Sequence, residues 1–165
     1  MPDMDYFFVV DIDLTSKAGF NTTNFLSNFM YPTSTWAVMT GSNTEYYHDV
    51  WALRSSPRIT FDFRVRMRSL SYFGLEYPWI HTRLNRIHNK GIPLDHPLIE
   101  VDSAFGAAAI YTAKYIRDEC RYDGLRKTGF WLFREQCEHV SFNLCVLKHA
   151  GPGKFFINPR FQVFW

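Results

Sequence analysis

The sequence feature that most constrains the fold is a short apolar segment near the N-terminus that ends in two carboxylates. Aromatic and β-branched side chains fill Tyr6–Val10, which is typical of a β-strand. Polar residues do not alternate with them, so we predict a strand buried on both faces, as in a parallel or mixed sheet covered by helices. Asp11 and Asp13 follow at the carboxyl end of this strand, where α/β folds place their ligands.

Further segments indicate an α/β fold with a mixed sheet and flanking helices. Asn21 is a suitable N-cap for a short helix that reaches Phe29, and apolar spacing predicts a second helix over residues 138–147. No linker or repeat divides residues 1–165, so we expect a single domain. The other predicted elements are strands at 36–40, 59–67, 98–101 and 155–157, a strand leading into a helix at 106–116, a helix at 79–88 and a loop at 120–129.

Composition limits the classes of function. Hydrophobic residues make up 47% of the chain and charged residues 21%, which excludes a disordered chain. Lys and Arg number 18 against 16 Asp and Glu, and this balance argues against a nucleic-acid-binding protein. No apolar run approaches the roughly 20 residues that cross a bilayer, and the acidic N-terminus is unlike a signal peptide.

Three cysteines are too few for a dense disulfide scaffold. Cys120, Cys137 and Cys145 contain no CxxC pair, and their neighbourhood lacks the usual spacing of zinc ligands. Reduced, partly buried thiols are the simplest interpretation. The alternative is one Cys120–Cys137 disulfide, which would form in an oxidising compartment.

Asp11 and Asp13 form a DxD pattern, which is the strongest chemical signal in the chain. Two carboxylates separated by one residue at a strand end can reach a single hard cation. Mn²⁺ and Mg²⁺ prefer oxygen ligands and also bind diphosphate oxygens. A solvated strand end without a ligand is the alternative interpretation.

The context of this motif resembles the GT-A fold of nucleotide-sugar-dependent glycosyltransferases. Residues 5–14 look like the DxD strand of that family, and three more segments follow in the family's order. Residues 36–54 resemble its next strand and its "YYD…ALR" stretch. Residues 102–107 resemble the "FGG" turn on the acceptor side, and residues 137–142 resemble the "xED" start of a helix that faces the donor sugar. The resemblance covers residues 5–159.

The resemblance implies a metal-dependent transferase that moves a sugar from a nucleoside diphosphate sugar to an acceptor hydroxyl. The acceptor would be a glycan or a glycoprotein, and the cofactor Mn²⁺ or Mg²⁺. It implies Asp11, Asp13 and His149 as metal ligands and Glu138 and His139 as catalytic residues. The implied substrate-binding residues are Tyr47, Asp49, Arg54, Asp102, Ser103, Phe105, Gly106 and Ala107.

The chain departs from the family pattern in two places. Family members bind the nucleotide base with a half-domain that precedes the DxD motif, whereas ten residues precede Asp11 here. We therefore expect the C-terminal portion of such a domain, completed by a missing N-terminal segment or a partner chain, in the cytoplasm or the Golgi lumen. His139 stands where the family has an acid, so the base is Glu138, His139 or neither.

Two other classes compete with the transferase. Asp11 and Asp13 also fit the nucleophile motif of haloacid-dehalogenase-like phosphatases, in which the first Asp attacks phosphorus. We find no later lysine and paired-acid motif after a strand to support that class. The third hypothesis is a partial transferase domain that binds without catalysis.

Overall fold

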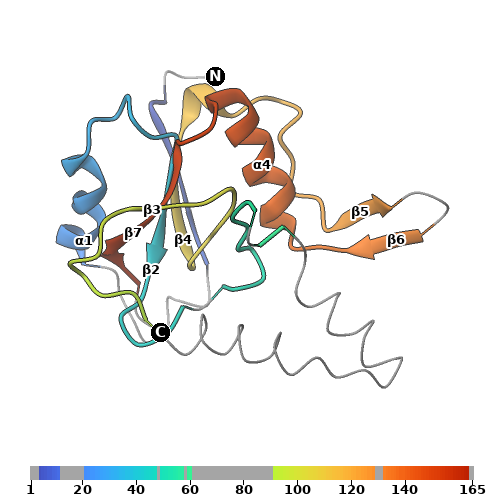
Figure 1. Cartoon of the computed structure of the whole chain (residues 1–165). Coiled ribbons are helices and arrows are strands. Elements are labelled where there is room, and N and C mark those ends of the chain that lie inside the picture. Colours follow the sequence, from blue (N-terminus) through green and yellow to red (C-terminus); the bar gives the residue numbers. More distant parts are fainter. Residues whose placement is uncertain are drawn as a thin grey trace.

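The protein is built around a mixed β-sheet (Figure 1). This computed structural model describes residues 4–11, 21–47, 49–57, 59–60, 91–128 and 132–163. Five strands form the sheet in the order β1-β4-β2-β7-β3, which confirms the predicted α/β class. Their bounds are Tyr6–Val10 (β1), Val38–Ser42 (β2), Ile99–Glu100 (β3), Ala108–Thr112 (β4) and Phe155–Gln162 (β7).

Helices lie on both faces of this sheet (Figure 1). On one face lies a short helical segment, and on the other lies the longer helix α4. A two-stranded hairpin projects from the α4 side, away from the main sheet. The elements are α1 (Thr22–Leu26), η2 (Ser27–Met30), η3 (Ala113–Tyr115), β5 (Leu125–Thr128), β6 (Leu132–Glu135) and α4 (Glu138–Ala150).

The strand directions bring the carboxyl ends of three strands to the same end of the sheet, which we call its carboxyl edge. β4 is antiparallel to both β1 and β2, whereas β2 is parallel to β7. β1, β2 and β7 therefore point the same way and end at the same edge. The turn that precedes β4 lies at that edge too, because β4 runs in the opposite direction.

Alternation along β4 divides the core between the two faces. Ala109 and Tyr111 belong to the cluster that contains Phe142 and Val146 of α4. Ala108 and Ile110 belong to the other cluster, which contains Phe161 and contacts Phe25 and Phe29 beside α1 and η2. Each face of the central strand thus has its own apolar cover, as the period of two requires.

β1 was correctly predicted as a strand but is not buried on both faces. It pairs with β4 at the edge of the sheet, and the Phe7 side chain is 42% exposed. Its other face is aromatic, with the rings of Tyr6 and Phe29 5.2 Å apart and those of Phe8 and Phe25 5.1 Å apart. The continuous apolar run therefore supplies one packed face, whereas Phe7 on the other face is exposed.

Several local predictions are confirmed, and others needed correction. The Asn21 side chain accepts a hydrogen bond of 2.9 Å from the Thr23 amide, and α4 begins at Glu138. The loop predicted at 120–129 is confirmed over residues 120–124 but wrong from Leu125, because Leu125–Thr128 forms β5 and pairs with β6. β7 extends through Pro159 to Gln162, beyond the predicted end at 157. The predictions for 61–67 and 79–88 lie outside the described residues.

The cysteine predictions also needed correction. The structure joins Cys120 to Cys145, with their Cα atoms 5.3 Å apart, and leaves Cys137 as a buried thiol outside the disulfide. Cys137 caps the start of α4, whereas Cys145 lies eight residues further on, about 12 Å along the helix axis. Cys120 reaches only the second of these positions. Among the described residues, no helix has the length and apolar character needed to cross a membrane.

Candidate functional site

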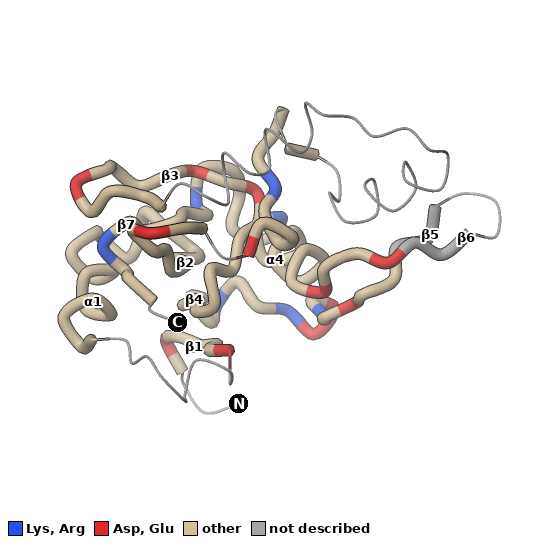
Figure 2. Tube along the Cα trace, turned by 90° about the horizontal axis from the view of Figure 1, so that it is seen from below, with Lys and Arg blue, Asp and Glu red and all other residues tan. Residues whose placement is uncertain are grey.

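The candidate site lies at the edge where β1 and β2 end and α4 begins. Figure 2 views the molecule from this edge. The half-buried Asp11 follows β1, and its amide donates a 2.9 Å hydrogen bond to the Ala107 carbonyl. This bond continues the β1–β4 ladder by one residue. It holds Asp11 beside the turn at residues 102–107.

Glycine is required where this turn meets β2. Gly106 has a φ of +57°, and a Cβ there would lie 2.0 Å from the Gly41 carbonyl oxygen. The two backbones touch directly, which leaves no room for a side chain. Ala107 follows with a φ of +68°, a left-handed conformation that costs an L-residue roughly 1–2 kcal/mol. The turn is therefore strained and closely packed at the candidate site.

Asn143 fixes the same turn to α4. The fully buried Asn143 side chain donates to Ser103 Oγ at 3.0 Å and to the Ala104 carbonyl at 2.9 Å. Its Oδ1 accepts a 2.8 Å hydrogen bond from the Tyr111 hydroxyl. One amide thus connects the turn, β4 and the helix. Such buried polar networks hold their members in a single arrangement when all are satisfied.

His139 lies in the first turn of α4, over this network. Its ring stacks on Phe105 with a centroid distance of 3.8 Å and meets the Tyr122 ring edge-on at 5.2 Å. Only 14% of the His139 side chain is exposed, compared with 48% for Glu138, and their Nε2 and Oε1 atoms are 3.9 Å apart. The buried His139 Nδ1 has no hydrogen-bond partner among the described residues.

Burial and nearby carboxylates act in opposite directions on this imidazole. Burial is the larger effect and lowers the pKa of His139 below its usual 6.5, so the neutral ring predominates at neutral pH. Asp49, Glu138 and Asp11 each raise the same pKa. His139 is therefore a neutral imidazole, and three carboxylates lie close enough to stabilise its protonated form in part.

The loop that follows β2 forms another side of the site. Asp49 Oδ1 accepts a 3.1 Å hydrogen bond from the Ala52 amide. The Tyr47 hydroxyl is buried without a hydrogen bond of normal geometry to a described residue, and burial raises the pKa of Tyr47, with Asp49 adding to the effect. The thiol of Cys137 is also buried here. Burial, and to a smaller extent the charge of Asp49, raises the pKa of Cys137 to about 12.

Arg54 and Asp102 act inside the loop structure. Arg54 is only 6% exposed, and its Nη1 donates 2.8 Å hydrogen bonds to the Trp51 and Leu53 carbonyls. Its amide donates to the Ser103 carbonyl at 2.8 Å. The Asp102 carboxylate accepts from the Ser56 amide. These contacts hold the loop against the turn. The Arg54 and Asp102 side chains therefore position the backbone of the site.

His149 does not join this group. It lies ten residues after His139 on α4, about 15 Å further along the axis. Its Nε2 is 2.9 Å from Glu119 Oε1, at the opposite end of the helix from Asp11. The structure therefore gives Asp11 no histidine ligand from position 149. Asp13 lies outside the described residues.

Among the described residues, the other predicted site residues lie in segments that come together. The turn at 102–107, the loop bearing Asp49 and the start of α4 meet around His139 and Asp11. Asn143 and Cys137 belong to the same region but were not predicted to be functional. The available signal for Asn143 was a polar amide in a helix expected to pack against a sheet. Such a group needs hydrogen-bond partners when it is buried.

No family model, curated protein or solved structure matches this chain. The site must therefore be interpreted through its chemistry. Oxygen donors suit a hard cation, and Asp11 places one such carboxylate at a strand end beside the turn. Asp49 adds a second acidic group within electrostatic range of the same imidazole.

Proposed function

We propose that the chain is a metal-dependent glycosyltransferase of GT-A type, which transfers a sugar from a nucleoside diphosphate sugar to a hydroxyl of a glycan or glycoprotein. The observation that carries the proposal is that Asp11, at the carboxyl end of β1, lies within electrostatic range of a desolvated His139. A transferase of this kind needs a carboxylate site for a cation beside a base for the acceptor.

In this proposal the carboxylates and the imidazole have separate roles. Asp11, together with Asp13, would hold the divalent cation. A bound cation would stabilise the charge that develops on the departing diphosphate. The neutral His139 would accept the proton of the acceptor hydroxyl if the reaction inverts the sugar, and Asp49 and Glu138 would stabilise the resulting imidazolium. Glu138 is the less suitable base, because nearly half of its side chain is exposed.

The outermost strand of the sheet, β1, supports the proposal of an incomplete GT-A domain. β1 pairs only with β4 among the described residues, which leaves backbone groups along its other side. A nucleotide-binding segment or partner chain could pair there by strand addition. Under this proposal the chain alone binds nucleotide sugars weakly, because the contacts to the base come from elsewhere.

A binding experiment tests the metal assignment without relying on turnover. Mn²⁺ is titrated calorimetrically into the wild type, Asp11→Asn and the control Asp118→Asn, each with and without UDP or GDP. We expect the nucleotide to strengthen Mn²⁺ binding in the wild type and in the control only. Asp118 is an exposed acid remote from the site. Equal binding by Asp11→Asn would refute the metal site.

A second experiment addresses the reaction. Sugar transfer and donor hydrolysis are measured over a panel of UDP- and GDP-sugars with the wild type and His139→Gln. Loss of a general base costs about 10²–10⁴-fold in rate, so any turnover should fall by that factor. Hydrolysis of p-nitrophenyl phosphate that depends on Asp11 would instead favour a phosphatase. Metal and nucleotide binding without any turnover would favour the non-catalytic domain.

A further inference from the structure

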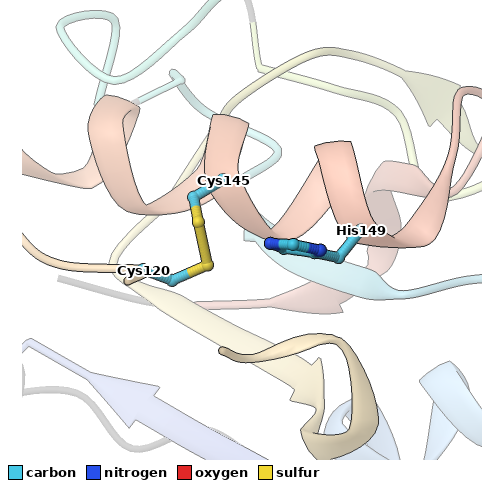
Figure 3. A group of neighbouring side chains, drawn as sticks. All are labelled: Cys120, Cys145 and His149. Atoms are coloured by element: carbon cyan, nitrogen blue, oxygen red, sulfur yellow. A yellow bond between two sulfur atoms is a disulfide. The ribbon is translucent and has the colours of Figure 1, made fainter. Parts of the chain in front are cut away.

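A second group of metal-ligating side chains lies at the far end of α4. Cys120, Cys145 and His149 place their ligand atoms within 4.8 Å of one another (Figure 3). Glu119 adds a carboxylate oxygen 2.9 Å from His149 Nε2. The group therefore offers two sulfurs, one nitrogen and one oxygen. It is remote from Asp11 and takes no part in the proposed transfer reaction.

The fold brings these donors together from only two segments. Cys145 and His149 are four residues apart on α4 and so share one face of the helix. Glu119 and Cys120 are consecutive in the loop after η3, and the Cα atoms of the two cysteines are 5.3 Å apart. Because Cys120 is 25 residues from Cys145, the spacing in the sequence does not resemble that of a short zinc motif.

The position of His149 is not explained by the disulfide or by an ion pair alone. Its Nε2 is buried and makes no hydrogen bond of normal geometry, although it lies 2.9 Å from the Glu119 carboxylate. The Glu119 side chain is 64% exposed, and ion pairs at such positions contribute little to stability. A buried imidazole nitrogen beside two sulfurs and a carboxylate oxygen is instead an arrangement that a metal ion can use.

We propose that reduction of the Cys120–Cys145 disulfide converts this group into a zinc site. A tetrahedral zinc ion with Zn–S of about 2.3 Å and Zn–N of about 2.0 Å holds its ligand atoms about 3.5–3.8 Å apart. The ligand atoms of Cys120, Cys145 and His149 lie within 4.8 Å of one another, so small side-chain movements suffice for these three, and the Glu119 carboxylate lies 2.9 Å from His149 Nε2. The ligands are both thiolates, the His149 imidazole and the Glu119 carboxylate. Zinc and the disulfide exclude each other, because both use the same sulfur atoms.

The chemistry balances with a dithiol as the reductant. Two electrons and two protons pass from the dithiol to the Cys120–Cys145 bond, which opens to two thiols, while the dithiol closes to its own disulfide. Zinc binding then displaces the two thiol protons to solvent, because the ligands are thiolates. The site is therefore open to zinc only under reducing conditions.

Zinc titration of the reduced and oxidised protein tests this proposal. The reductant is removed anaerobically before Zn²⁺ is titrated against a chromophoric chelator, and circular dichroism records the fold. We expect one equivalent to bind to the reduced protein and none to the oxidised protein. Co²⁺ in place of Zn²⁺ should give tetrahedral absorption bands with thiolate charge transfer.

Variants separate this site from adventitious binding. His149→Ala should weaken zinc binding by at least tenfold in the reduced protein, whereas His96→Ala, at an exposed histidine, should not. Cys120→Ala with Cys145→Ala should abolish binding, and Cys137→Ala should leave it unchanged. The proposal is overturned if the reduced protein, folded or unfolded, binds no zinc, if oxidation does not reduce binding, or if His149→Ala binds as the wild type does.

Discussion

Replacing Asn143 with alanine tests whether the buried amide holds the candidate site together. The amide makes hydrogen bonds of 2.8, 3.0 and 2.9 Å with Tyr111, Ser103 and Ala104, and its side chain is 0% exposed. Alanine removes all three bonds and leaves their partners buried.

The expected loss of stability follows from the three partners. A buried group left without a partner costs about 1–3 kcal/mol. The Ala104 carbonyl bears the full cost because it cannot turn away, whereas the hydroxyls of Ser103 and Tyr111 can rotate toward other acceptors. We therefore expect Asn143→Ala to lower the free energy of unfolding by about 3–5 kcal/mol. For a domain of this size, that corresponds to a fall in Tm of roughly 10 °C.

Urea unfolding followed by circular dichroism measures this effect, with two comparison variants. Tyr111→Phe removes only one of the three bonds, the one to Asn143 Oδ1, and should cost about 1–3 kcal/mol, less than Asn143→Ala. Leu144→Ala changes the neighbouring position of the same helix, where the side chain is 44% exposed, and should cost less than about 1 kcal/mol. An Asn143→Ala variant as stable as Leu144→Ala would refute the role assigned to the network.

Three further changes test the turn and the imidazole. Gly106→Ala should lower the free energy of unfolding by about 2–5 kcal/mol, because the new Cβ would lie 2.0 Å from the Gly41 carbonyl oxygen. Gly151→Ala is the control: its φ is +88° but nothing lies within 4 Å of the new Cβ, so it should cost only about 1 kcal/mol. Chemical unfolding measures both. Ala107→Gly should raise stability by up to about 1 kcal/mol, since it relieves a φ of +68°; a loss would contradict this. Because the folded pKa of His139 lies below 6.5, the unfolded state binds more protons, so stability should fall as the pH drops from 6.5 through the folded pKa. Urea unfolding at about pH 5 and pH 7.5 should show this dependence in the wild type and a weaker one in His139→Phe.

Local sequence patterns predicted the elements whose signals lie within a few residues. Asn21 caps α1 through its own side chain, and α4 begins at Glu138, where helical spacing starts. Local patterns did not predict which strands pair. β2 lies between β4 and β7, and Val38 pairs with Phe155. Nothing within either segment specifies a partner more than a hundred residues away. The predicted burial of β1 was wrong for the same reason, since its place at the edge depends on the other strands.

The candidate site shows the same division between local and distant information. Asp11 and Glu138 were predicted from motifs, and the structure brings their segments to one edge. His149 was expected to join Asp11 only because the resemblance to the GT-A family implied a C-terminal histidine ligand. In the structure α4 continues to Ala150, so a rigid helix keeps His149 at the opposite end.

The position of His139 on α4 explains why its imidazole is neutral at rest and why protonating it costs less than burial alone would impose. Burial against Phe105 disfavours the charged ring, and the positive end of the helix dipole acts in the same direction in the first turn. The carboxylates of Asp49, Glu138 and Asp11 favour the charged ring. In the proposed reaction the ring is therefore free to accept a proton from the acceptor, and the acidic groups already in place stabilise the product of that transfer. A residue at the same depth without these carboxylates would remain a poor base, because no opposite charge would offset its desolvation. The pairing of a desolvated histidine with acidic neighbours is thus the feature that makes this edge of the sheet suited to proton transfer.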